Sequence, residues 1–405
     1  MRRVVITGAG TVNPLGQTVA ETLAAMQAGR VAIGPLDIPL LERLSVKIGA
    51  QVRGWQPEAH FDKARLAFLD RHVQFALVAA RQAMAEAGLR PDPARSAVIM
   101  GTAGGGLVTS DEAYRAVYAE GKARVHPFTV PRLMPSAAAS HISMEFGLTG
   151  PTFAVSSACA SSNHAIGLAF QMVRAGMVDQ ALAGGSEAML SFGGLKAWEG
   201  LRVMSPDGCR PFAAGRNGMV QGEGAAVFLL ETLEAAQARG AAVLAEVAGF
   251  AMTADAADIV LPNPEGAARA MAGALADAGL APDAVDHINA HGTGTAANDR
   301  SEAEAMARVF GARAFGGRAG AIPVTATKSL HGHLIGAAGA VELIGVLSAL
   351  QGLIPPTAGF DAADPACAVD LVTGAARRAE VGVALSNAFA FGGLNAVLAL
   401  RRAGA

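Results

Sequence analysis

The residues best suited to covalent chemistry lie in a run of small side chains around one thiol, Ser156-Ser-Ala-Cys-Ala-Ser-Ser162. Residues 152–155 before this run predict a short buried strand, and residues 165–174 after it predict a helix. Cys159 therefore lies at a strand-to-helix corner, where the positive end of the helix favours a thiolate, and we expect its pKa to fall below the ordinary value of about 8.5. Small neighbours leave room for a substrate carbonyl and for backbone N–H donors. The alternative is a buried structural cysteine.

Two loops that contain histidine supply candidate partners for the thiol. His291 follows a predicted strand, and His333 lies in a loop that also carries Lys328 and His331 and opens an apolar helix. Neither loop has the ligand spacing of H-E-x-x-H or C-x-x-C, so we expect no metal site there. The alternative for any histidine is a satisfied core or surface residue, which we expect for His60, His72, His126 and His287.

A thiol and two histidines together suit a carbon–carbon bond-forming reaction. An acyl group held as a thioester needs a thiolate. A second substrate that becomes a carbanion needs donors for its enolate oxygen, and two neutral imidazole N–H groups can supply them. We expect Lys328 to organise the electrostatics of the histidines together with Glu342, which lies further along the following helix.

The bulk composition excludes several other functions. The chain has 405 residues, and its 32 Lys and Arg against 34 Asp and Glu leave a net charge of −2, which argues against nucleic-acid or membrane-surface binding. Cys159, Cys209 and Cys367 are too few and too scattered for a disulfide framework or a zinc site. No signal-peptide pattern and no run that could span a bilayer is present, so we predict a cytoplasmic location.

The opening segment, 4–16, resembles part of the glycine-rich fingerprint that binds a dinucleotide cofactor. Gly8 and Gly10 follow strand-forming residues, but Asn13 stands where the third glycine of G-x-G-x-x-G belongs, and no acidic residue follows at the usual place. We therefore predict a tight strand–helix turn and no bound dinucleotide.

One α/β unit recurs half a chain apart. The stretch 83–92 leads into Gly101-Thr102 just as 274–283 leads into Gly292-Thr293, and both Gly88/Gly279 and Gly101/Gly292 are 191 residues apart. This repeat indicates an internal duplication, and the segment 383–393 resembles the strand and loop around Cys159. Alternating strands and helices predict mostly parallel sheets covered by helices. We place the halves at 1–248, with the nucleophile, and 249–405, with the two histidines.

Four ordered motifs resemble the signatures of the β-ketoacyl-[acyl carrier protein] synthases: Ser157-Ala-Cys-Ala, Asn289-Ala-His-Gly-Thr, Thr327-Lys-Ser-Leu-His-Gly-His and Phe391-Gly-Gly-Leu-Asn. The resemblance is to the elongating, Cys-His-His branch of the thiolase-like superfamily and covers essentially the whole chain. Within that branch, 134–139, 328–333 and 386–391 look most like the nodulation-type synthases, which build specialised, often unsaturated acyl chains. The resemblance implies an α/β, five-layered αβαβα fold of two duplicated halves, in a homodimer or, alternatively, a heterodimer.

The resemblance also implies a role for each catalytic residue. Cys159 would take the acyl chain from the phosphopantetheine arm of an acyl carrier protein. His291 and His333 would assist decarboxylation of malonyl-carrier protein and stabilise the enolate that attacks the thioester, which gives a 3-oxoacyl chain two carbons longer. The backbone N–H groups of Cys159 and Phe391 would form the oxyanion hole, with Phe391 also acting as a gate. Lys328 and Glu342 would be the supporting pair.

Further residues carry over from the same resemblance. The substrate-binding residues would be Gly104, Leu195, Thr293, Thr295, Phe391 and Gly392. No cofactor is implied besides the carrier's phosphopantetheine, and no metal takes part in catalysis. Some members hold a structural cation near residues that match Asn289, Glu342, Ser386 and Asn387.

Three residues depart from the family pattern. His331 stands where many relatives carry Thr, Leu394 replaces the usual Thr or Ser, and Ala390 replaces a common Gly and stiffens the gate. We therefore expect changed gating or substrate range. Gly104 matches a position where bulkier residues close the acyl pocket, which predicts that longer or kinked chains are accepted.

Other activities remain as alternatives to a synthase. A thiolase needs a second catalytic cysteine in a glycine-rich motif, which Cys367 does not provide, and a malonyl decarboxylase variant would lack Cys159. A partner subunit that shapes chain length in a heterodimer usually lacks the nucleophile. An acidic carrier protein would dock on basic residues. The candidates, each with an ordinary surface charge as its alternative, are Lys63, Arg65, Lys196 and Arg202.

Overall fold

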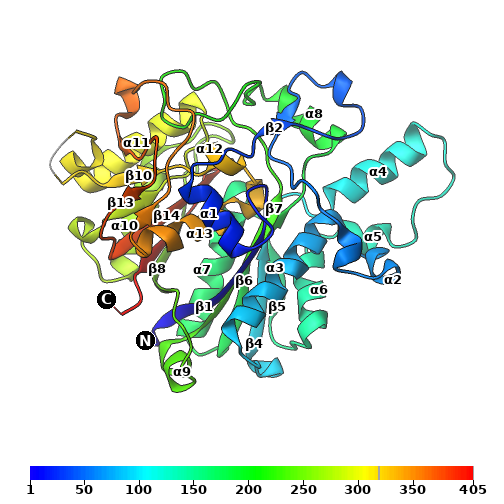
Figure 1. Ribbon diagram of the computed structural model, residues 1–405, viewed down its shortest axis with the longest axis horizontal. Coiled ribbons are helices and arrows are strands. Elements are labelled where there is room, and N and C mark those ends of the chain that lie inside the picture. Colours follow the sequence, from blue (N-terminus) through cyan, green and yellow to red (C-terminus); the bar gives the residue numbers. More distant parts are fainter. Residues whose placement is uncertain (318–319, 405) are drawn as a thin grey trace.

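At the centre of the fold lies one continuous β-sheet (Figure 1). The structure is a computed structural model and describes residues 1–317 and 320–404. Eleven strands of these residues form the sheet, in the order β12 (Asp370–Leu371), β10 (Pro323–Thr325), β9 (His287–Asn289), β14 (Val383–Ala390), β15 (Leu394–Arg401), β8 (Ala245–Ala254), β1 (Val4–Val12), β7 (Gly224–Thr232), β6 (Gln180–Glu187), β4 (Ser96–Gly101) and β5 (Thr152–Val155). The two halves of the chain meet where β1 pairs antiparallel with β8.

Helices form the remaining layers. The central helices α7 (Ser161–Arg174) and α13 (Ala338–Leu350) pack against each other and against strands of both halves. The outer face of the first half is covered by α3 (Arg71–Ala87) and α6 (Ala137–Phe146), and that of the second by α10 (Pro264–Asp277) and α11 (Ala296–Phe310). Alternate residues of a strand serve different layers, since Ile99 faces the central core and Val98 the outer one. The predicted five-layered αβαβα fold is confirmed.

The internal duplication predicted from the repeated A-G-L-x-P-D stretch is visible in the strand order. Counted from the junction, the first half runs β1-β7-β6-β4-β5 and the second runs β8-β15-β14-β9-β10. Gly88 and Gly279 both follow the outer helix with a left-handed backbone, at φ +59° and +64°. Each then leads through a 3₁₀ turn into the matching strand, β4 or β9. The boundary at residue 248 stays a prediction.

The prediction of mostly parallel sheets is wrong. Parallel pairs occur only at the outer ends of the sheet, whereas β1, β7, β8 and β15 pair antiparallel with all their neighbours. For the pair of β14 and β15 the reason is the turn at 391–393, which is too short for a crossover and joins the two strands as a hairpin. The segment 383–393 is therefore the counterpart of β6 in the sheet and not of the strand before Cys159.

Gly8 and Gly10 have a packing role rather than a turn role. Both lie inside β1, directly beneath α3, and not in the predicted strand–helix turn. A Cβ atom on Gly8 would lie 2.1 Å from the carbonyl oxygen of Ala83, and one on Gly10 would lie 1.9 Å from that of Ala79. Only glycine allows the helix to approach this closely, so the glycine pair serves the core.

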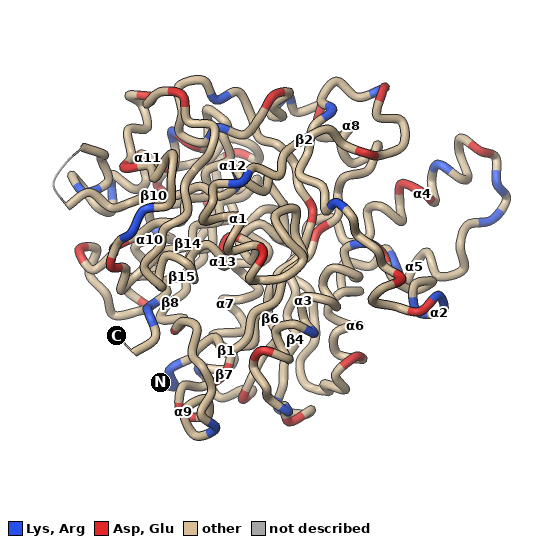
Figure 2. The backbone as a smooth tube through the Cα atoms, viewed as in Figure 1, with Lys and Arg blue, Asp and Glu red and all other residues tan. Residues whose placement is uncertain are grey.

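The charged residues lie mostly around the periphery of the molecule (Figure 2). Lys328 is fully buried and Glu342 almost fully, which is rare for charged side chains and calls for a function. No helix within the described residues is both long and apolar enough to cross a membrane.

Candidate active site

Cys159 lies on a short, strained turn between β5 and α7. The 3₁₀ turn Ala158–Ala160 leads directly into α7, and Ala158 adopts a left-handed backbone at φ +47°, which is uncommon for a residue with a side chain. Ser161 holds the turn, because its Oγ accepts from the Ser157 N–H at 2.9 Å and donates to the Ala158 carbonyl at 2.6 Å. The turn thus fixes the thiol at the start of the central helix.

The electrostatic surroundings of the thiol differ from the expectation. Burial raises the pKa of the Cys159 thiol to about 12, and the nearby positive charge of Lys328 opposes this rise without outweighing it. Desolvation therefore outweighs the helix terminus, which was expected to lower the pKa of the Cys159 thiol. The buried Cys159 is therefore a neutral thiol, and it must give up its proton as it reacts.

His291 and Lys328 form one hydrogen-bonded unit. The Lys328 ammonium group forms an ion pair with Glu342 Oε1 at 2.5 Å, and it donates to the His291 carbonyl oxygen at 2.5 Å and to His291 Nδ1 at 3.3 Å. The Asn289 amide also donates to Glu342 Oε2, at 3.0 Å. Because Nδ1 accepts a hydrogen bond, the proton of the neutral His291 ring lies on Nε2.

His333 reaches the same tautomer by a different route. Its Nδ1 accepts from the backbone N–H of Ile335 at 3.1 Å, which again leaves the ring proton on Nε2. The chain bends sharply at this point, since Ile335 has φ +46°. The His333 backbone N–H donates to the Val220 carbonyl at 2.6 Å, which ties the loop to the first half of the chain.

Both imidazoles remain neutral. Burial, together with the positive charge of Lys328, holds the pKa of His291 and that of His333 well below 6.5. The two ring centroids are 5.4 Å apart, and the nearest ligand atoms of Cys159, His291 and His333 lie within 4.8 Å of one another. Two neutral N–H donors and one thiol thus converge, as the proposed enolate chemistry requires.

A cavity of about 200 Å³ opens onto these three residues. Thr293, Thr295 and Phe391 line it as the resemblance implies. The other three predicted substrate-binding residues lie apart from its lining. Leu195 is buried in an apolar cluster, Gly104 contacts Glu187 and Met189, and Gly392 follows Phe391 in the turn. Their roles in substrate binding stay predictions.

Glu302 positions the loop that carries His291, and sequence reasoning missed it. Its carboxylate accepts from the backbone N–H groups of His291 and Gly292, both at 2.8 Å, and from the Asn387 amide at 3.1 Å. Burial raises the pKa of Glu302 to about 7. The available signal was an acidic residue on the inner face of the helix 296–310 that follows the histidine loop.

His331, Leu394 and Ala390 depart from the family pattern. The fully buried His331 ring contacts the Gly332 carbonyl at 2.8 Å and the Thr327 hydroxyl at 3.0 Å, so it braces the turn that carries Lys328. Leu394 and Ala390 pair with each other at the end of the β14–β15 hairpin, directly beside the turn of Phe391. The changed residues thus lie behind the site and under the gate.

Cys159, His291 and His333 are, within the described residues, the one group of three or more His, Cys, Asp or Glu side chains whose ligand atoms lie close enough together to hold a metal ion. Their hydrogen bonds oppose this. Both Nδ1 atoms already accept a donor, so each Nε2 keeps its proton and has no free lone pair for a metal.

The structural cation implied by the resemblance fits part of its proposed site. Asn289 Oδ1 and Ser386 Oγ are buried without a hydrogen-bond partner and come from paired residues of β9 and β14, next to Glu342. Asn387 points to the opposite face of β14, toward Glu302. Asn289, Ser386 and Glu342 could therefore hold a cation that supports the Lys328 unit.

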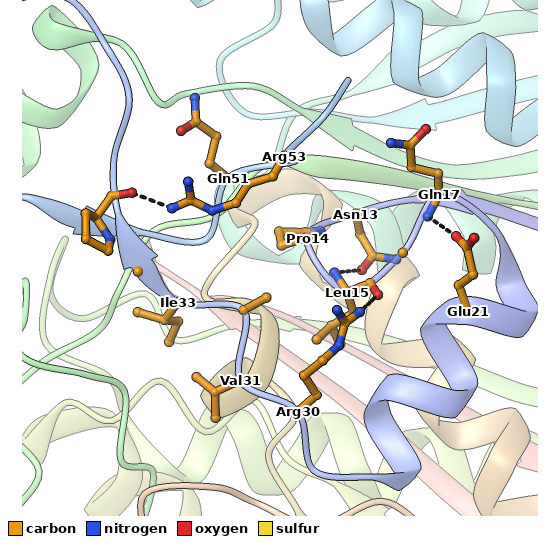
Figure 3. A pocket seen from close by; sticks show the side chains of 14 residues that line it. Asn13, Pro14, Leu15, Gln17, Glu21, Arg30, Val31, Ile33, Gln51 and Arg53 are labelled. Carbon is orange, nitrogen blue, oxygen red and sulfur yellow. Dashed lines mark hydrogen bonds between the residues drawn. The ribbon is translucent and has the colours of Figure 1, made fainter. Parts of the chain in front are cut away.

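A larger cavity, of about 1040 Å³, lies beside the turn that follows β1 (Figure 3). It is lined by the turn after β1 and by residues 30–35, 51 and 53, none of which is Cys, His or Lys. Its polar groups pair with one another: Arg30 with the Leu15 carbonyl, Arg53 with the Pro35 carbonyl, and the Gln17 N–H with Glu21. We assign no chemistry to it.

Comparison with known proteins agrees with this geometry. Residues 1–236 match the family model "Beta-ketoacyl synthase, N-terminal domain", and residues 244–361 match "Beta-ketoacyl synthase, C-terminal domain". Nodulation protein E of Rhizobium sp. (strain N33) is 48% identical over 99% of both chains. The 3-oxoacyl-[acyl-carrier-protein] synthase 2 of Staphylococcus aureus (strain COL) is 37% identical over 99% of this chain and 98% of that protein. Among solved structures, the ishigamide ketosynthase/chain length factor superposes with a TM-score of 0.93, at 34% identity over 100% of both chains.

Proposed function

The chain belongs to the β-ketoacyl synthase family of condensing acyltransferases, and from this premise we propose that Cys159, His291 and His333 carry out a decarboxylative Claisen condensation. The product is a 3-oxoacyl chain two carbons longer, for fatty-acid or specialised acyl or polyketide biosynthesis. Lys328 and Glu342 are positioning residues in this proposal, because they act through His291.

The first half-reaction loads the acyl chain. The Cys159 sulfur attacks the thioester carbonyl of an acyl-carrier protein, and the bond to the phosphopantetheine sulfur breaks. The proton of the Cys159 thiol passes to the departing pantetheine thiol, which suits a thiol that burial keeps neutral before the reaction. The oxyanion formed in between would be held by the backbone N–H groups of Cys159 and Phe391.

The second half-reaction makes the carbon–carbon bond. Malonyl-carrier protein loses CO2, and the electron pair of the broken bond passes to the thioester oxygen as an enolate. That oxygen would accept from Nε2–H of His291 and of His333. The enolate carbon then attacks the Cys159 thioester, and the sulfur leaves as a thiolate that takes up a proton from solvent.

The observation that carries the proposal is the shared tautomer of the two histidines. Lys328 and the Ile335 N–H occupy the two Nδ1 atoms, which leaves two neutral Nε2–H donors in a cavity with one thiol. A general base would need a free lone pair at Nε2 instead, so the arrangement favours enolate stabilisation over proton abstraction.

The partners follow from the same chemistry. The substrates are acyl and malonyl thioesters on the phosphopantetheine of an acyl carrier protein, and we propose no cofactor of the chain's own. Of the four candidate docking residues, Arg65 is paired with Glu145 and Lys196 with Glu199. Lys63 and Arg202 are exposed and have no ion pair within the described residues, so they are the better candidates. A cytoplasmic location stays a prediction.

The last part of the proposal concerns the second chain with which this chain assembles. We propose a homodimer, as is usual in the family, while the likeness to a ketosynthase/chain length factor supports a heterodimer as the alternative. A chain-length subunit without activity of its own is the less favoured function, because the thiol and both donors are present together.

Intact mass spectrometry tests the proposed function. The protein is incubated with acyl-carrier proteins of several chain lengths, with Cys159→Ala as the control. We expect an acyl adduct on the wild type alone. A wild type that gains no adduct from any chain length would contradict the synthase and support the partner subunit.

A further inference from the structure

Trp198 stands against the gate of the catalytic cavity. Its indole lies on α8 (Phe192–Gly200) and stacks on the Phe391 ring, with centroids 5.8 Å apart and an interplanar angle of 27°. Both rings line the cavity that contains Cys159, His291 and His333. Trp198 has no place in the reaction described above, so its position needs a separate explanation.

The two stacked rings have very different supports. Trp198 packs against an apolar cluster made by Leu36, Leu44, Val46, Leu190, Leu195, Met204 and Met219. Its helix is fixed at its start, where Ser191 Oγ accepts from the Gly194 N–H at 3.2 Å and Asp111 accepts from the Gly193 N–H at 3.1 Å. The indole is therefore held from behind by the core.

Phe391, in contrast, stands at the tip of the β14–β15 hairpin. The next two residues are Gly392 and Gly393, at φ +81° and +68°. Glycine adopts these values without strain and can leave them without strain. Of the two rings, Phe391 is thus the one whose backbone can turn, once the hydrogen bond from the Gly392 N–H to the Ile259 carbonyl, at 2.8 Å, is released.

The size of the cavity requires such a turn. A volume of about 200 Å³ is below the range of about 300–1,000 Å³ that ligand pockets usually have. An acyl chain on Cys159 needs additional space beside the two histidines. Displacement of Phe391 from Trp198 would supply it, and the stack with Trp198 resists that displacement.

We propose that Trp198 is the latch of this gate, a positioning residue that holds Phe391 closed until an acyl chain enters. The inference rests on the proposed function, since only acyl loading on Cys159 demands the opening.

Tryptophan fluorescence can follow the latch directly. The chain has only two tryptophans, Trp55 and Trp198. Trp55 stacks on His60 at 4.8 Å and donates to Gln74, outside the lining of the cavity. A Trp55→Phe variant therefore leaves Trp198 as the single reporter. We expect its emission to change in step with the acyl adduct measured by intact mass, and to stay constant in the same background with Cys159→Ala.

A double-mutant cycle tests whether the latch acts through Phe391. Trp198→Leu keeps an apolar contact with the cluster but removes the stack. We expect it to raise the rate of acyl loading roughly 2- to 10-fold, the range that corresponds to one aromatic pair. Phe391→Leu should do the same, and Trp198→Leu should add nothing in the Phe391→Leu background.

The possible outcomes distinguish a failure of the latch from a failure of the proposed function on which it rests. Complete acylation without any change in Trp198 emission would overturn the latch and leave the synthase intact, as would independent, additive effects of the two variants. The absence of an adduct in the wild type and in every variant would overturn the proposed function and the latch with it.

Discussion

In both halves of the molecule a 3₁₀ turn leads into a central helix, Ala158–Ala160 before α7 and Ile335–Ala337 before α13. Each turn begins with a strained residue in the left-handed region, Ala158 at φ +47° and Ile335 at φ +46°. The first turn carries the thiol within itself. The second carries no reactive group, but its first N–H donates to His333 and sets the tautomer of that ring.

The comparison shows how a duplicated backbone acquired two tasks. The strained turn positions the thiol of Cys159 in the first half, and its counterpart orients a donor histidine in the second. Likewise, each Gly-Thr loop is held by a buried carboxylate that accepts from consecutive N–H groups. Glu187 holds Ala103 and Gly104, and Glu302 holds His291 and Gly292. We infer that the first half stores the acyl chain and the second makes the enolate.

Removal of a donor histidine should give the largest separation of the two tasks. His291→Ala or His333→Ala should slow malonyl decarboxylation and condensation by about 10²–10³-fold, because each removes one donor to the enolate oxygen. Acyl loading of Cys159 should persist. CO2 release and intact mass measure the two activities in one sample. Equal loss of both would contradict the division between the halves.

Lys328→Met should have the next largest effect. Without its ammonium group His291 loses the donor that fixes its tautomer, and we expect decarboxylation to fall roughly 10- to 100-fold. Since the single change leaves Glu342 buried and unpaired, Lys328→Met with Glu342→Gln is the matched control for folding. Wild-type decarboxylation by the double variant would show that His291 needs no orienting group.

Gly104→Ile sharpens the role assigned to the first half. The first side-chain atom would lie 3.3 Å from Glu187 Oε1 and 3.3 Å from Met189 Cε, so the larger side chain must push into the space beyond. We expect about tenfold slower loading of long chains and little change for short ones. Competition between acyl-carrier proteins of different lengths measures this, with Gly104→Ala as the control. An equal loss at all lengths would remove Gly104 from the acyl pocket.

The smallest expected effect is in the pH dependence of Cys159 alkylation, which directly compares the influence of burial with that of the helix terminus on the pKa of the thiol. Burial raises the pKa of Cys159 to about 12, so the thiolate fraction is still increasing at every pH where the fold is usable. Alkylation by iodoacetamide should therefore keep rising up to pH 10. A plateau near or below pH 8.5 would show that the helix terminus prevails over burial.

The grouping of Cys159, His291 and His333 could be predicted from sequence, because each residue lies in a short local pattern. Each of Cys159, His291 and His333 follows a strand along the chain, and small or glycine-rich neighbours mark all three loops. The duplication could be predicted as well, because the repeat of 191 residues reports it without any knowledge of the tertiary structure, whereas the five layers followed from the family resemblance.

The features that sequence reasoning missed depend on contacts between distant segments. The Glu302 contacts, the Trp198–Phe391 stack and the antiparallel pairs of β1 arise only when the layers assemble. The pKa of Cys159 was expected in the wrong direction for the same reason: the helix terminus is local and visible in the sequence, while the burial that dominates is not.

Cys159→Ala offers the most direct test of the division between the halves. Malonyl-carrier protein is given to this variant, and the release of CO2 is measured beside the acyl adduct. The account predicts that the adduct disappears while decarboxylation continues, because His291 and His333 keep their tautomers without the thiol. Loss of both activities in a folded variant would contradict it and show that the thiol and the histidines act as one inseparable unit.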